Sequence, residues 1–296
     1  MNQVTLAIGF GLVTSAILAL SAVAFTLQFG VSNIFNLAFG DVMVIAAFAA
    51  YAANVAGADI WVAMTAGALA GALTSVLINR AVFVPFLRRG TSLFTMVMVS
   101  LAVATILSNG LQVVVGTTFR SYRVPAEASL HIVGMLLTPR ELVVIGIAVA
   151  SMLALHGLMR YTRIGKAMRA TAADAELARS CGIATDRVTT IAWAISGALC
   201  GLGGVALALN LASFNFTFGS SFLLVIVAAA VFGSVGQPYG AMVGALVIGM
   251  SSELAAIVTP SLKSVVAFAI LVLVLLVRPN GLLRAGFVQR MSVSAR

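Results

Sequence analysis

The sequence predicts an all-α fold, a polytopic bundle of about eight to ten transmembrane helices, in a chain of 296 residues. Hydrophobic residues make up 61% of the chain and charged residues only 8%, whereas a soluble domain carries roughly 25% charged residues. A water-soluble fold of this size could not cover its surface with so few charges. Residues 1–296 are expected to form one transmembrane domain, because no linker or soluble appendage interrupts them.

Apolar runs follow one another along the whole chain. A spanning helix needs about 20 predominantly apolar residues. The runs cover residues 4–27, 41–56, 60–82, 93–115, 140–160, 188–210, 219–235, 239–258 and 262–277. The residues between the first two runs, Gln28–Gly40, are apolar enough to stay within the membrane. Discontinuous segments are therefore expected inside the bundle.

The basic residues predict one orientation in the membrane. Short loops rich in Lys and Arg face the cytoplasm, and such loops occur at 83–92, at 161–187 and in the tail from Arg278. With these regions inside, the N-terminus and the loop 116–139 lie outside and the C-terminus lies inside. The net charge of +9 is not gathered on one face, so no nucleic-acid partner is expected. The first run lacks the basic n-region of a signal peptide and is expected to remain as a helix.

Small residues recur at four-residue spacing in two of the runs. Gly67 and Gly71 form one such face, and Gly240 and Gly244 form another that continues to Gly249. Small residues let helix backbones approach closely in a membrane bundle. Helix packing is therefore the expected role of both faces.

Residues that could carry catalysis are sparse. The Gly165-Lys166 pair lacks both the upstream Gly and the following Ser or Thr of a P-loop, so the chain has no P-loop for ATP hydrolysis. His131 and His156 stand alone in the sequence, so neither a metal cluster nor a nucleophilic triad is expected. Glu253 could contact substrate, but we favour a side chain that snorkels toward the outer end of its helix.

The loop 160–187 is the longest polar stretch of the chain. A weakly apolar stripe at helical spacing predicts a helix in its middle. The stripe consists of Met168, Ala172, Ala175 and Ala178. Thr171 or Asp174 could stand near the start of this helix, and Gly182 could end it. A short surface helix of this kind fits a groove in another protein, although a plain solvated loop explains the composition equally well.

A resemblance favours the docking interpretation. Glu176-Leu177-Ala178, with Gly182 six residues after the acid, resembles the EAA loop of ABC importer permeases, although Leu177 replaces the commonest Ala. The stretch 162–170 is similar to permeases of branched-chain amino acid importers in particular. The resemblance implies that this loop is a coupling helix seated on an ATPase subunit. The implied coupling residues are Arg163, Gly165, Arg169, Asp174, Glu176, Ala178 and Gly182.

The segment Phe29–Asp41 places amides, glycines and an acid inside an apolar region. An Asp at the centre of a membrane helix costs roughly 2.5–3.5 kcal/mol on translocon scales. Irregular backbone at that depth is tolerated where it is buried or lines a cavity, and broken helices often form substrate sites in transporters. The predicted path residues are Asn33, Phe35, Asn36, Phe39 and Asp41. A plain interhelical polar contact, or a helix start capped by Asp41, would explain the segment without a path.

Further motifs extend the resemblance from about Phe25 to Leu283. The segment Phe29–Asp41 is similar to the family's Asn-containing stretch before its second helix, although Phe39 stands where many members carry His. The turn 232–241 resembles the family's Gly-rich turn, and we expect a structural role there before substrate contact. The C-terminal stretch 277–283 matches the family's R-P-x-G-L pattern, which would stop the last helix at the cytoplasmic face.

The resemblance implies the transmembrane subunit of an ATP-driven importer, with a fold like that of type II ABC importer permeases, in a bacterial cytoplasmic membrane. The implied partners are a homologous second permease, two ATPases, an external substrate-binding protein and membrane lipid. ATP and Mg would be bound by the ATPases, so this chain is expected to carry no cofactor and to be no enzyme itself. The implied cargo is leucine, isoleucine or valine, and the alternatives are urea, short amides or another small solute.

Two other classes of protein remain as alternatives. A stand-alone secondary carrier would need intramembrane charges at mid-depth and would transport alone. A membrane-embedded enzyme would need catalytic residues clustered at one membrane face. Neither feature is found in the sequence, and the coupling-like loop favours the importer.

Overall fold

The computed structural model describes residues 3–124, 130–132, 135–257, 259 and 262–277. The predicted C-terminal motif after Val277, the basic tail and Glu127 lie outside the described residues. The elements are α1 (Gln3–Ser32), α2 (Phe39–Val55), α3 (Ile60–Ile78), the π-helix η1 (Asn79–Phe83), α4 (Val84–Arg88), α5 (Leu93–Val115), β1 (Leu130–Ile132), β2 (Met135–Leu137), α6 (Pro139–Tyr161), α7 (Arg163–Ala173), α8 (Ala175–Ser180), α9 (Thr185–Asn210), α10 (Phe218–Phe232), α11 (Pro238–Ala256) and α12 (Leu262–Val277).

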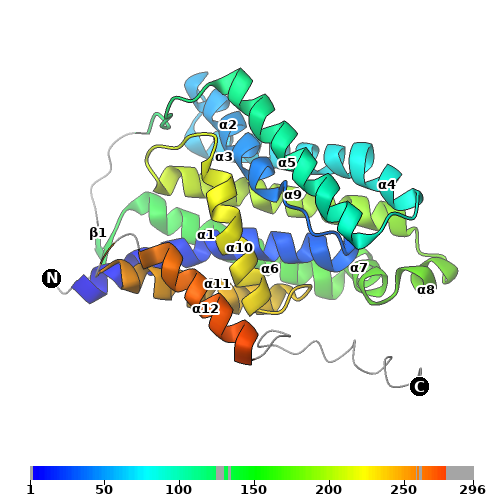
Figure 1. Cartoon of the computed structure of the whole chain (residues 1–296). Coiled ribbons are helices and arrows are strands. Elements are labelled where there is room, and N and C mark those ends of the chain that lie inside the picture. Colours follow the sequence, from blue (N-terminus) through cyan, green and yellow to red (C-terminus); the bar gives the residue numbers. More distant parts are fainter. Residues whose placement is uncertain (1–2, 125–129, 133–134, 258, 260–261, 278–296) are drawn as a thin grey trace.

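The bundle is built around α1 and α9, which contact each other along its centre (Figure 1). Helix α11 packs on α1, α3 packs on α9, and α2 packs against both α3 and α9. Helix α10 runs across the general direction of α1 and α9 (Figure 1). The short helices α4, α7 and α8 lie at one end of the bundle, and the hairpin of β1 and β2 lies at the other end (Figure 1). We refer to the end with α4, α7 and α8 as the basic end.

The predicted membrane architecture is confirmed. In the described part of the chain, six helices are long and apolar enough to cross a membrane. The stretches Phe39–Val55, Phe218–Phe232 and Val265–Val274 are shorter apolar helices. Together these elements account for each predicted apolar run. The all-α prediction missed a two-stranded antiparallel hairpin, in which Leu130 pairs with Leu137.

Two predicted boundaries were wrong. Helix α1 continues to Ser32, five residues past the predicted end of its run at residue 27. The third run does not end in a loop at residue 83, because η1 and α4 continue the helix to Arg88. Pro85 has no backbone N–H for the helical ladder, and the wider π-turn that precedes it is one of the usual ways a helix accommodates such an interruption. A sequence pattern detects polarity, and the helix continues through the polar residue Arg80 and ends only at Arg88.

The two small-residue faces pack helices together, as predicted. A Cβ atom at Gly71 would collide with the backbone oxygen of Gly197, and one at Gly201 would press on the backbone of Gly67. These contacts join α3 to α9 with the backbones almost touching. On α11, a Cβ atom at Gly244 would collide with the backbone oxygen of Ala229 in α10. Packing therefore explains why both faces carry glycine.

Aromatic side chains close the end of the bundle opposite the basic end. The rings of Phe48, Tyr51 and Tyr122 all pack around Phe214, with centroid distances of 5.2–6.2 Å. The hydroxyl of Tyr122 donates a hydrogen bond of 2.9 Å to the backbone oxygen of Ala47. Burial raises the pKa of Tyr122 above its usual range, so this hydroxyl remains a donor. The cluster ties the connections after α5 and α9 to α2.

Glu253 does not snorkel, contrary to the expectation. It is buried in α11, and its carboxylate accepts a hydrogen bond of 2.9 Å from the hydroxyl of Thr14 in α1. It also forms an ion pair of 2.8 Å with Lys263 of α12. A buried carboxylate needs such partners to offset its desolvation. Glu253 therefore joins three helices and is not a free end group.

The close contact between α3 and α9 predicts a selective effect of one methyl group. Replacing Gly71 with Ala should force the two backbones apart and lower the free energy of unfolding by about 1–3 kcal/mol. Gly146→Ala is the matched control, because a methyl group added at Gly146 on α6 would meet no atom within 4 Å. The melting temperature of each purified variant in mild detergent checks this expectation. Equal melting temperatures for the two variants would show that the contact can relax without cost.

Candidate functional site

Helix α2 begins inside the bundle, beside the last third of α1. The ring of Phe39, the first residue of α2, packs edge-on against Phe25 of α1 at 5.5 Å. Phe25 precedes the last residue of α1, Ser32, by about 10 Å of helix. The connection between the helices therefore folds back along α1. Helix α2 has only 17 residues, which fits a start below the membrane surface.

The five predicted path residues differ in exposure. Asn33 is exposed and has a left-handed backbone with a φ of 52°. Phe35 is half-buried and packs against Phe25 at 5.4 Å. Asn36 is buried, and its Oδ1 accepts a hydrogen bond of 3.0 Å from the backbone N–H of Ala38. The Asn33 side chain is therefore exposed, whereas the Asn36 amide stabilises the turn before α2.

Phe39 and Asp41 lie in the protein interior. Phe39 is fully buried, and its backbone oxygen accepts a hydrogen bond of 3.5 Å from the Cys200 thiol of α9. Asp41 is buried in the first turn of α2. It does not cap the helix, because the N-cap residue is Ala38, which makes no side-chain cap. A carboxylate in the first turn is favoured by the helix dipole, which offsets part of the cost of burying Asp41.

The start of α10 meets the start of α2, and the sequence interpretation missed this site. A Cβ atom at Gly40 would press on the backbone oxygen of Gly219, so the two helix starts almost touch. Polar residues surround the beginning of α10. Thr217, Ser220 and Ser221 are exposed there, and Asn215 beside them is half-buried. Short helices whose N-termini meet inside a bundle are a recurring way to build substrate sites. The available signal was the alternation of polar residues with phenylalanine from Ser213 to Phe218, followed by Ser220 and Ser221.

The glycine-rich turn between α10 and α11 is structural, as expected. Gly233 and Gly240 approach so closely that a Cβ atom on either would collide with the other's backbone oxygen. Ser234 and Gly236 have positive φ values of 82° and 91°. The turn also lies against α1, because a Cβ atom at Gly30 would come within 3.2 Å of the Gly236 backbone. The geometry allows α10 and α11 to form a tight hairpin beside the end of α1.

The predicted coupling segment contains two helices, α7 and α8, and the predicted single stripe was wrong. Met168 and Ala178 are buried, but Ala172 and Ala175 are exposed. The chain breaks at Asp174, whose backbone is extended with a φ of −158°. Helical spacing cannot continue across such a break. The buried face of α7 consists instead of Gly165, Met168 and Thr171.

Both ends of α8 are fixed by the residues that the sequence singled out. The Asp174 carboxylate accepts hydrogen bonds of 2.9 Å from the backbone N–H groups of Glu176 and Leu177. At the other end, Gly182 has a φ of 85° and donates to the backbone oxygen of Arg179, while Ile183 donates to that of Ala178. This pair of hydrogen bonds is the Schellman pattern of helix termination.

Helix α8 is joined by side chains to the start of α9. The Arg179 guanidinium donates to the Thr185 hydroxyl at 3.0 Å and lies 3.3 Å from the Asp186 carboxylate. Asp186 also lies 3.5 Å from the Arg88 guanidinium of α4. These pairs are exposed, so each contributes little stability alone. As a connected set they fix the direction of α8 relative to α4 and α9.

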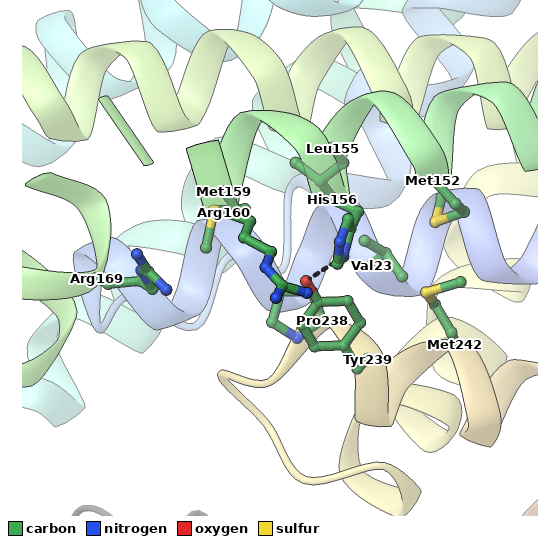
Figure 2. A pocket seen from close by; sticks show the side chains of 10 residues that line it. All are labelled: Val23, Met152, Leu155, His156, Met159, Arg160, Arg169, Pro238, Tyr239 and Met242. Carbon is green, nitrogen blue, oxygen red and sulfur yellow. Dashed lines mark hydrogen bonds between the residues drawn. The ribbon is translucent and has the colours of Figure 1, made fainter. Parts of the chain in front are cut away.

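The remaining predicted coupling residues separate into two groups. Arg163 and Glu176 are exposed at the basic end, and Leu177 beside them keeps 59% of its surface exposed. Gly165 is buried, because α7 lies directly on the last turn of α6 there. Arg169 points to a different place and lines a cavity between α6, α7 and α11 (Figure 2). The first group forms an exposed surface on the outside of the basic end.

The cap at Asp174 predicts how α8 responds to mutation. Asp174→Ala should remove both capping hydrogen bonds and destabilise α8 by about 0.5–2 kcal/mol. Asp174→Asn is the matched control, because Asn caps helices about as well as Asp. Amide hydrogen exchange should then accelerate in residues 175–182 of the Ala variant alone. Unchanged exchange in that variant would mean that contacts with α9 hold α8 without its cap.

Comparison with known proteins agrees with this architecture. The family described as "Branched-chain amino acid transport system / permease component" matches residues 7–275. The permease LivH of Escherichia coli K12 is 29% identical, over 92% of this chain and 93% of LivH. BraD of Pseudomonas aeruginosa is 27% identical, over 92% and 93% of the two chains. LivH of Methanocaldococcus jannaschii, a probable branched-chain amino acid permease, is 26% identical, over 92% and 90%.

A solved structure shares the fold. PsaBC from Streptococcus pneumoniae, in complex with Fab, superposes with a TM-score of 0.53 at 13% identity. The match covers 92% of this chain and 91% of that one. The family match extends over nearly all of the described helices, including α7, α8 and the segment before α2. The chain is a multi-pass membrane protein and belongs to the branched-chain amino acid transport permease family.

Proposed function

We propose that this chain forms one half of the translocation path of an importer for leucine, isoleucine or valine. A homologous permease supplies the other half, two ATPases dock at the basic end, and an external binding protein delivers the substrate. The N-terminus lies outside and the C-terminus lies in the cytoplasm of a bacterial cell, in agreement with the positive-inside rule. ATP and Mg are bound by the ATPases, and this chain carries no cofactor.

The geometry of α8 is the observation that carries this proposal. Its N-terminus and C-terminus are each fixed by two hydrogen bonds. Between them, Glu176 and Leu177 are exposed. A short helix with fixed ends and an exposed apolar residue between them fits a groove on a partner. Because Arg179 joins α8 to the start of α9, movement of an ATPase under α8 would be transmitted to the centre of the bundle.

The environment of the proposed path suits a substrate with an apolar side chain. Phe29 in the last turn of α1 packs at 6.4 Å against Phe35 on the fold-back before α2, and both are only partly buried. Asn33 offers an exposed amide next to them. An apolar wall with a few polar partners is the usual composition of small-molecule sites. Aromatic residues at this position favour a branched aliphatic cargo over urea or a short amide.

Co-purification tests the assembly. A tagged chain is extracted from native membranes in mild detergent, and its partners are identified by mass spectrometry. A second permease and two ATPase chains should accompany it, and reconstituted complex should take up leucine only with ATP and binding protein present. Uptake by this chain alone, without ATP, would replace the importer with a secondary carrier.

The left-handed Gly182 gives a test of coupling. Gly182→Pro should reduce substrate-stimulated ATPase activity of the assembled complex to its basal rate. Proline fixes φ near about −65° and lacks the N–H that Gly182 donates to Arg179. Gly182→Asn is the control, since Asn tolerates the left-handed region, and it should retain stimulation. Normal stimulation in the Pro variant, with ATPases still bound, would remove α8 from coupling.

The exposed amide of Asn33 gives a test of the path. Asn33→Gly keeps a residue that accepts a positive φ but removes the amide. Loss of one hydrogen bond of about 0.5–1.5 kcal/mol to the substrate should raise the KM of uptake about two- to tenfold with kcat nearly unchanged. Asn109→Ala is the control, because Asn109 is an exposed amide on α5 that bonds within its own helix. An unchanged KM in Asn33→Gly would exclude Asn33 from the substrate site.

A further inference from the structure

A cavity of about 390 Å³ lies between α1, α6, α7 and α11 (Figure 2). Small-molecule sites commonly have volumes of about 300–1,000 Å³. Two arginines, Arg160 of α6 and Arg169 of α7, lie toward one end of the cavity, and two methionines, Met152 of α6 and Met242 of α11, lie toward the other (Figure 2). The cavity is therefore cationic at one end and apolar at the other.

The two arginines of the cavity have no carboxylate partner among the described residues. Among the described residues that line it, none is acidic. Arg160 stacks over the Tyr161 ring at 5.6 Å, and neither arginine is paired with a carboxylate in the described part of the chain. His156 and Tyr239 are hydrogen-bonded to each other at 2.7 Å beside Arg160 (Figure 2). Guanidinium groups in this situation are suited to bind a phosphate group.

The polarity of the cavity follows the direction of the membrane normal. Along α6, Met152 precedes Arg160 by eight residues, which is about 12 Å of helix. Arg160 lies in the last turn of α6, next to the basic end of the bundle, so Met152 lies deeper in the membrane. The cationic end is thus at the level of lipid headgroups and the apolar end at the level of acyl chains.

Helix α1 separates this cavity from the proposed substrate path. Val23 lines the cavity, whereas Phe25 contacts Phe39 at the start of α2. Residues two apart on a helix point about 200° apart, so the two side chains lie on opposite faces of α1. The cavity is therefore a separate site.

The surface beside the cavity is apolar and exposed. On α6, Leu153 keeps 66% of its surface exposed, and on α11 Tyr239 and Val243 keep 53% and 49%. An acyl chain leaving the cavity would lie along these side chains. Basic pockets between transmembrane helices near the cytoplasmic face are known to hold anionic headgroups.

We propose that this cavity binds one anionic phospholipid, with its phosphate between Arg160 and Arg169 and an acyl chain along Met152 and Met242. The bound lipid would join α6 and α7 to α11 without contacting the substrate. Assignment of the lipid to the cytoplasmic leaflet rests on the proposed orientation. The proposal that an anionic lipid binds rests only on the residues that line the cavity.

Native mass spectrometry of the purified importer complex tests the site. The complex is exchanged into detergent that contains equal amounts of phosphatidylglycerol and phosphatidylethanolamine with the same acyl chains. Wild type should retain phosphatidylglycerol selectively. The double variant Arg160→Gln/Arg169→Gln should retain at least about tenfold less, because two charge-assisted contacts are lost. Arg187→Gln, which removes an exposed arginine at the same end of the bundle but outside the cavity, should retain the wild-type amount.

A second variant separates a lipid from a free anion. Met242→Trp keeps both arginines but fills the apolar end, and it should also lose phosphatidylglycerol. If this variant binds like wild type and inorganic phosphate alone displaces the lipid, the site takes a free anion and the lipid proposal fails. Equal retention by the double Gln variant would also overturn it. Lipid bound to the isolated chain but absent from the assembled complex would identify the cavity as a subunit contact instead. None of these measurements depends on transport. A failure of the proposed importer function would therefore appear in the uptake assay and not in lipid binding.

Discussion

The architecture depends on backbone-to-backbone contact between helices at glycines. In a bilayer the lipid tails are as apolar as the side chains, so helix association relies on close packing more than on the hydrophobic effect. Gly71 of α3 lies directly on Gly197 of α9, and Gly40 of α2 lies directly on Gly219 of α10. No side chain separates these pairs. No side chain fits between backbones at this distance, so sliding one helix past the other would force a side chain into the contact. We therefore expect helices joined at these glycines to move together.

This packing permits the two short helices to begin inside the bundle. The first backbone N–H groups of a helix have no partner within the helix, and in a membrane they need protein or a polar cavity around them. Before α2, the Asn36 side chain accepts a hydrogen bond from the backbone N–H of Ala38. Before α10, the Asn215 side chain accepts one from the backbone N–H of Thr217. The Gly40–Gly219 contact brings the two starts together. The interior of the bundle thereby contains polar groups in an otherwise apolar environment.

Much of this organisation could be predicted from the sequence, and the failures share a physical cause. Apolar runs, the glycine faces, Asp174 and Gly182 are local signals, because each acts through residues within a few positions along the chain. The start of α10 and the lipid-sized cavity arise from residues far apart in the chain, and nothing local marks them. The chemistry of a single side chain is also compatible with more than one role, even at a residue that the sequence pattern marks. The same Asn36 amide fits a substrate contact or a turn, and only its burial and its bond to Ala38 show the turn.

Helix α9 is the element that connects the basic end with the start of α2, where we place the substrate path. At its start, Asp186 and Thr185 hold Arg179 of α8. Further along, Cys200 contacts the first residue of α2, and a Cβ atom at Gly204 would press on the backbone oxygen of Met43. In the proposed function, displacement of α8 would act on the start of α9, and α9 packs directly on the start of α2. Coupling of distant sites requires such a contiguous, packed element with more than one stable position. Here one helix, α9, extends from the basic end to the start of α2, so a change at the proposed docking surface would reach the proposed path without unfolding any segment between them.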